Sequence, residues 1–188
     1  NHNLQGLRVV DVLEERYPDF PGLNLTCEVR EGIVRHSSAF DKSAKIKEFT
    51  RDESPTLETQ VVDIADEIAY DNHDLDDGLT SGLLKESDLE KLLIWNDIRA
   101  RVSKRYTKID TDRKKYLIIR SLIDTQVTDL IQETEKRIEN LKLKSYLEVK
   151  KLDKKVVSFS KEILNLRKPL REFLMEKLYH HYRVTRMS

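Results

Sequence analysis

Cysteine is nearly absent from this chain, and long apolar runs and an excess of either charge are absent altogether. Its 188 residues hold one cysteine, Cys27, which excludes an internal disulfide and predicts a reducing, cytoplasmic location. No apolar run approaches the roughly 20 residues that a membrane-spanning helix needs, so no membrane partner is expected. The 34 basic and 34 acidic residues cancel, which leaves a nucleic-acid partner possible but unsupported by net charge.

Glycine and proline are also scarce, at 5 and 4 residues. No stretch alternates apolar and polar residues as a strand does, so the composition predicts an all-α protein. A nucleotide-binding fold with a glycine-rich phosphate loop is not supported, because no such loop is present. The length predicts one helical unit over 1–188, with a loop or insertion at 37–55 and helices over 3–16, 27–34, 55–75, 87–102, 111–140, 145–165 and 167–182.

Several sequence signals predict where these helices begin. Thr26 is placed to cap a helix that runs through Val34. Pro55 and Pro169 stand where a proline would occupy a first helical position. The stretch SDLE at 87–90 has the form of a capping box and predicts a helix start there.

The most unusual segment is acidic. Seven carboxylates fall within the fifteen residues from Asp63 to Asp77, and no lysine or arginine occurs between Gln60 and Lys85. A solvated helix usually carries basic partners at four-residue spacing, whereas unpaired carboxylates repel one another. A metal ion or a basic partner segment would compensate for this repulsion, and a plain acidic, solvated helix flank remains the alternative.

One face of this segment groups polar side chains. Asp66, Tyr70 and Asp74 stand at i, i+4 and i+8, so a helix places them in a row about 12 Å long. Apolar residues on other faces are expected to pack inward; these are Ile64, Ile68 and Leu75. The row has space for a metal at one end and a sugar-sized polar ligand at the other.

Four separated stretches also carry a family resemblance. They are HNLQGLR at 2–8, PGLNLT at 21–26 with EGIVRH at 31–36, ETQVVDIADEIAY at 58–70 with NHDLDDG at 72–78, and LMEKLY at 174–179 with YRV at 182–184. In order and spacing they resemble the central part of the HD-domain deoxynucleoside triphosphate triphosphohydrolases, the dGTPase-like family. The resemblance implies a multi-helix HD-domain bundle, truncated at both ends, from a homo-oligomeric enzyme. Its reaction would hydrolyse deoxynucleoside triphosphates, dGTP among them, to deoxynucleoside and tripolyphosphate.

The resemblance also implies roles for individual residues. The family holds a divalent metal such as Mg²⁺ or Mn²⁺ with a His…His-Asp…Asp set, and Asp66 matches the final aspartate. Tyr70 and Asp74 match positions that contact the deoxyribose and its 3′-hydroxyl, so His73-Asp74 is not taken as the metal motif. His2 matches a catalytic histidine that helps to protonate the leaving group. The family's other metal ligands fall upstream of residue 1, so the printed chain is expected to be incomplete as an enzyme.

Two other functions remain open at this point. The chain could be an HD-type phosphohydrolase acting on another nucleotide, or a non-catalytic helical interaction module. The carboxylates of Asp66 and Asp74 argue against the second, because a scaffold has no need for unpaired acids. His36 is interpreted as a basic residue placed favourably at the negative end of a helix dipole.

Overall fold

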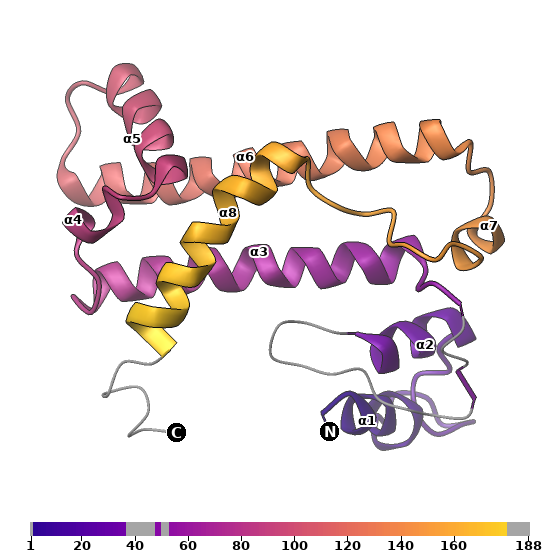
Figure 1. Ribbon diagram of the computed structural model, residues 1–188. Coiled ribbons are helices and arrows are strands. Elements are labelled where there is room, and N and C mark those ends of the chain that lie inside the picture. The colour runs from indigo at the N-terminus through magenta and orange to yellow at the C-terminus, as the bar shows by residue number, and fades with distance from the viewer. Residues whose placement is uncertain (1, 37–47, 50–52, 180–188) are drawn as a thin grey trace. The chain divides into compact units, whose positions relative to one another are not determined.

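The computed structural model describes residues 2–36, 48–49 and 53–179 (Figure 1). These residues form helices and no strand, which confirms the all-α prediction. Among them, no helix combines the length and the apolar character needed to cross a membrane. The elements are α1 His2–Arg8, the π-helical η1 Val9–Leu13, α2 Cys27–Arg35, α3 Leu57–Thr80, α4 Glu86–Leu89, α5 Leu93–Arg105, α6 Thr111–Leu141, α7 Tyr146–Lys150, α8 Lys161–Leu174 and the π-helical η2 Met175–Tyr179.

The contacts divide the chain into two compact units. The first unit comprises Asn1–Glu67 and Glu135–Ser158, and the second comprises Ile68–Thr134 and Phe159–Ser188. Helices α3 and α6 each begin in one unit and end in the other. The prediction of a single unit over 1–188 stays a prediction, and most of the predicted loop at 37–55 lies outside the described residues.

Side chains cap the first turns of several helices, but some of these helices begin at other residues than predicted. Thr26 caps α2 as predicted, and its hydroxyl accepts a hydrogen bond from the backbone N–H of Val29. The predicted start at Pro55 is wrong, because α3 begins at Leu57 and the Thr56 hydroxyl accepts from the N–H of Thr59 at 3.4 Å. The predicted start at Pro169 is also wrong: Pro169 lies inside α8, which is capped by Ser160.

Two predicted helices are interrupted. In place of one helix over 87–102 the chain forms α4 and α5, and the cap lies earlier than predicted, with Asp88 accepting from the N–H of Lys85 at 3.3 Å. In place of one helix over 145–165 the chain forms the short α7, a stretch without helix over 151–160, and the start of α8. Within 151–160 the N–H groups of Val156 and Val157 donate to the fully buried Gln60 side chain, at 2.7 and 3.1 Å, instead of to a helix.

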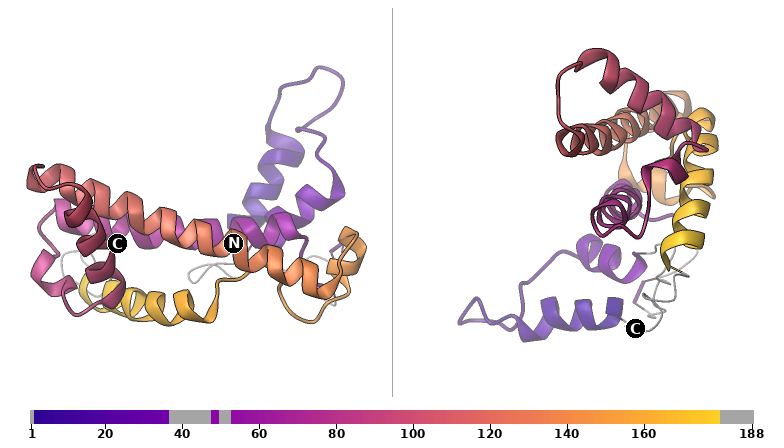
Figure 2. Two further views of the ribbon diagram at one scale, coloured as in Figure 1. Left: turned by 90° about the horizontal axis from the view of Figure 1, so that it is seen from above. Right: turned by 90° about the vertical axis from the view of Figure 1, so that its left-hand side faces the viewer.

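The second unit is built around one apolar core. Trp95 and Ile98 of α5, Leu122 of α6 and Leu170 of α8 are almost completely buried in it. Figure 2 shows α5 folding back over the start of α6. The inward-packing prediction is confirmed for Ile68 and Leu75, while Ile64 is only partly buried.

The first unit brings α2 close to the start of α3. A Cβ atom on Gly32 would lie only 2.9 Å from the Thr59 hydroxyl, so the absence of a side chain permits this close approach. Lys150 of α7 donates to the buried Glu31 at 3.1 Å and also pairs with Glu53. These two carboxylates, Glu53 first, raise the pKa of Lys150 against the opposing effect of burial. The ion pairs thereby hold α7 beside α2.

Candidate functional site

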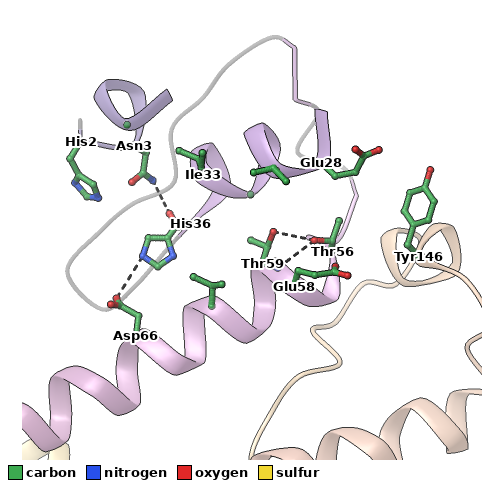
Figure 3. A pocket seen from close by; sticks show the side chains of 14 residues that line it. His2, Asn3, Glu28, Ile33, His36, Thr56, Glu58, Thr59, Asp66 and Tyr146 are labelled. Atoms are coloured by element: carbon green, nitrogen blue, oxygen red, sulfur yellow. Dashed lines mark hydrogen bonds and ion pairs between the residues drawn. The ribbon is translucent and has the colours of Figure 1, made fainter. Parts of the chain in front are cut away.

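A pocket of about 840 Å³ lies within the first unit (Figure 3). Its volume falls in the range of roughly 300–1,000 Å³ that is typical of small-molecule sites. Part of its wall is apolar, from Gly6, Val29, Gly32, Ile33 and Val62. Polar side chains from α1, α2 and α3 also reach it, among them His2, Glu28 and Asp66.

Asp66 is the carboxylate of the acidic segment that faces this pocket. Its side chain is 30% exposed, and its Oδ2 lies 3.6 Å from Nε2 of His36. The other ring nitrogen of His36, Nδ1, lies 2.9 Å from Oδ1 of Asp63. A carboxylate can only accept, so we assign the Nδ1 hydrogen to a bond donated to Asp63. The ring is therefore oriented from behind, with Nε2 directed at Asp66 (Figure 3).

Asp63 is itself fixed in place. Its side chain is only 2% exposed, and its second oxygen, Oδ2, accepts from Nζ of Lys155 at 2.7 Å. Polar contacts therefore run in series from Lys155 to Asp63, from Asp63 to His36, and from His36 to Asp66. A buried carboxylate behind a histidine is a common way of fixing the ring orientation next to a functional ligand.

Asn3 ties the end of α2 to α1. Its buried side-chain amide donates to the carbonyl oxygens of His36 at 2.8 Å and Val34 at 3.3 Å. Because Asn3 follows His2 directly, this clamp brings His2 and His36 to the same pocket, although 34 positions separate them in the sequence. Glu28, also on the wall, has a pKa below its usual range because its carboxylate accepts from its own backbone N–H and from Thr26.

The four residues singled out from the sequence are placed differently. His2 and Asp66 line the same pocket, as their proposed roles require. Tyr70 and Asp74 lie one and two turns farther along α3, in the second unit, and do not line this pocket. Since α3 is unbroken from Leu57 to Thr80, the predicted spacing of Asp66, Tyr70 and Asp74 on one helix is confirmed, and their roles stay predictions.

Three carboxylates of the acidic segment have basic partners, all of them outside the segment. Asp63 pairs with Lys155, Asp76 pairs with Lys115 at 3.4 Å, and the buried Asp71 pairs with Arg167 at 2.8 Å. The cations come from distant parts of the sequence, which is why the local pattern gave no sign of them. A basic partner segment, one of the two predicted compensations, accounts for these three residues.

Asp66 is the candidate metal ligand of this pocket. Within the described part of the chain, no three His, Cys, Asp or Glu side chains are grouped closely enough to hold a metal ion. A catalytic metal usually needs about three protein ligands. Asp66 fits as one such ligand, because its carboxylate is partly exposed on a pocket wall. The remaining ligands would have to come from outside the described residues.

His36 is the site residue that the sequence interpretation missed. It was assigned to the dipole of α2, and it does terminate that helix. A signal was present nonetheless, because His36 is the last residue of the EGIVRH stretch that carries the family resemblance. Its contact with Asp63 and Asp66 depends on the packing of α2 against α3, which the sequence did not predict.

Comparisons with known proteins agree with the motifs. No protein-family model matches the chain. The chain is 43% identical over 187 residues to a "Deoxyguanosinetriphosphate triphosphohydrolase-like protein" of Geobacter metallireducens. The matched region covers 99% of this chain and 49% of the relative. Like-named proteins of Geobacter sulfurreducens and Thiobacillus denitrificans are each 41% identical, over 99% and 100% of the chain and 49% and 50% of their own lengths. The chain thus spans about half the length of the curated relatives it matches.

Proposed function

We propose that this chain, a homologue of the deoxyguanosinetriphosphate triphosphohydrolase-like proteins, supplies part of the active site of a metal-dependent deoxynucleoside triphosphate triphosphohydrolase. The observation that carries the proposal is the pocket in which Asp66, His36 and His2 meet, within a chain that is homologous over nearly its whole length. Dependence on Mg²⁺ or Mn²⁺, dGTP among the substrates and a homo-oligomeric assembly belong to the same proposal.

The proposed reaction separates the deoxynucleoside from its three phosphates. Water attacks the α-phosphorus, the bond from that phosphorus to O5′ breaks, and a proton passes to O5′ of the leaving deoxynucleoside. A bound divalent metal would stabilise charge on the phosphate and lower the pKa of the attacking water. His2, exposed on the pocket wall, would supply the proton to O5′.

The chain's other residues bind and orient. Asp66 would provide one oxygen ligand to the metal, and His36 would hold the Asp66 carboxylate in position. Asp74 would accept a hydrogen bond from the 3′-hydroxyl of the sugar, with Tyr70 beside the deoxyribose. In this account a monophosphate lacks the β- and γ-phosphates that leave as part of tripolyphosphate, whereas a ribonucleotide carries an additional 2′-hydroxyl for which the site offers no partner.

The test is a substrate panel with the whole protein. Each of the four deoxynucleoside triphosphates is compared with the matching monophosphates, ribonucleoside triphosphates and cyclic nucleotides, in Mg²⁺ and in Mn²⁺. The proposal predicts release of tripolyphosphate from the deoxynucleoside triphosphates. Turnover confined to monophosphates or cyclic nucleotides would instead support another HD-type phosphohydrolase.

His36→Ala is expected to weaken metal binding at Asp66 by roughly 10- to 100-fold, the usual cost of losing an orienting partner. The reason is that the Asp66 carboxylate loses the side chain 3.6 Å away that restricts its position. Titration calorimetry of the metal-free protein with Mn²⁺ measures this. Glu58→Gln is the matched control, because Glu58 lines the same pocket two turns earlier on α3. Equal Mn²⁺ affinity in His36→Ala and Glu58→Gln would remove His36 from the site.

Asp74→Asn is expected to weaken binding of a deoxynucleotide by roughly 10-fold while leaving Mn²⁺ affinity unchanged, since an amide accepts the 3′-hydroxyl hydrogen bond less strongly than a carboxylate. Calorimetry with a non-hydrolysable deoxynucleotide and, separately, with Mn²⁺ gives both constants. A 3′-deoxy analogue should bind the wild type and the variant alike. If both constants fall together, the sugar-contact role is refuted.

A further inference from the structure

A second hollow, of about 460 Å³, lies between α5 and α6 within the second unit. Three arginines line it: Arg101 and Arg105 from α5 and Arg120 from α6. The hydroxyls of Tyr106, Ser121 and Thr125 are on the same wall. This arginine groove shares no lining residue with the Asp66 pocket.

None of these three arginines forms an ion pair with a described residue, whereas most of the other described arginines do. Arg101 donates to the Thr125 hydroxyl at 3.2 Å, and the guanidinium of Arg105 lies 5.5 Å from the ring centroid of Tyr106. Arg120 makes no hydrogen bond or ion pair with the described residues, and its side chain is exposed. Arginines elsewhere do pair with carboxylates, namely Arg16, Arg30, Arg35, Arg99, Arg113, Arg167 and Arg171.

The groove therefore concentrates positive charge. Asp124 is the one carboxylate among its lining residues, against three guanidinium groups. Arginine keeps its proton at any ordinary pH, so these three positive charges are available to an anion throughout the working range of the protein. The planar fork of donors on each guanidinium matches the oxygen atoms of a phosphate group.

We propose that this groove binds an anion with several phosphate groups, held by Arg101, Arg105 and Arg120. Its volume suits a ligand of nucleotide size or smaller. The hydroxyls of Ser121 and Thr125 add neutral donors beside the guanidinium groups. The phosphates could belong to a free nucleotide or to a nucleic-acid backbone, which present the same chemistry to the groove. The inference does not rest on the proposed hydrolase activity, because none of the groove residues has a role in that proposal.

The test uses inorganic tripolyphosphate as the probe, titrated into the whole protein in buffer with a chelator, so that metal-dependent binding is removed. Wild type should bind, and the affinity should fall steeply as salt concentration rises. Arg120→Gln should weaken binding by roughly 10-fold, and the triple change of Arg101, Arg105 and Arg120 to glutamine by at least roughly 100-fold, since charge-assisted hydrogen bonds are lost. Arg99→Gln is the matched control, because Arg99 lies on α5 but pairs with Glu90 at 3.0 Å.

Two outcomes would overturn the proposal: no binding by the wild type, or equal affinity in the triple variant and the Arg99→Gln control. Thermal unfolding of each variant checks folding, and if the triple variant is unfolded the single variants decide. Competition then identifies the source of the phosphates. Displacement of the probe by a nucleoside triphosphate or by a single-stranded oligonucleotide would support one source or the other. Displacement by neither would also overturn the proposal, because the anion would then bind adventitiously.

Discussion

Asp66→Ala is expected to abolish both hydrolysis and metal binding, with a loss in kcat/KM of at least roughly 1,000-fold, or about 4 kcal/mol of transition-state stabilisation. The physical reason is that the proposed metal would lose one of about three protein ligands, and with it the negative charge of the Asp66 carboxylate. Turnover of deoxynucleoside triphosphates and the metal content of the purified protein measure the two effects. Both are measured in the whole protein with Mn²⁺ in excess.

Glu58→Ala is the control for this change. Glu58 is another carboxylate on the same helix and on the wall of the same pocket, so it matches Asp66 in charge and surroundings. Its loss should leave turnover within about twofold of wild type, because Glu58 is exposed and has no role in the proposed reaction. Normal turnover and normal metal content in Asp66→Ala would refute the assignment of Asp66.

The largest expected effect on stability comes from Asp71→Ala, at about 3–5 kcal/mol of the free energy of unfolding. The side chain of Asp71 is 10% exposed and that of its partner Arg167 is 4% exposed, with Oδ2 and Nη2 at 2.8 Å. Arg167 also lies over the ring of Phe159, at 4.2 Å from the centroid. Removing the carboxylate leaves a buried cation that cannot lose its proton, which is far more costly than losing a surface pair.

Chemical denaturation of the wild type and the variant measures this difference. Asp77→Ala is the control, since Asp77 is an exposed carboxylate on the same helix, and its loss should change stability by less than about 0.5 kcal/mol. Replacing Asp71 and Arg167 together by apolar residues should recover part of the loss, because no buried charge then remains. Equal stability of Asp71→Ala and Asp77→Ala would mean that this pair does not hold α3 to α8.

The fold class could be predicted because it rests on local properties. Scarce glycine and proline, helical periodicity and the Thr26 cap act within a few residues, and α2 and α6 form close to where these signals predicted. The interruptions could not be predicted in the same way. Residues after α7 leave the helical conformation because Gln60, nearly 100 positions away, accepts their backbone N–H groups.

The same distinction applies to the candidate site. Asp66 and His2 could be singled out, because both lie in stretches that carry the family resemblance. The pairing of Asp63 with Lys155 and of Asp71 with Arg167 could not, since each joins residues more than 90 positions apart. His36 was misinterpreted for a related reason: its helix end was identified correctly, but the carboxylates that meet it lie on another helix.

The central claim is that this pocket serves an enzyme that cleaves deoxynucleoside triphosphates between the α-phosphorus and O5′. The most direct measurement is phosphorus NMR of the products formed by the whole protein from dGTP in ¹⁸O-labelled water. The account predicts deoxyguanosine and tripolyphosphate, with the label on a terminal phosphorus of tripolyphosphate. Release of pyrophosphate or orthophosphate, or label found in the deoxynucleoside, would contradict it.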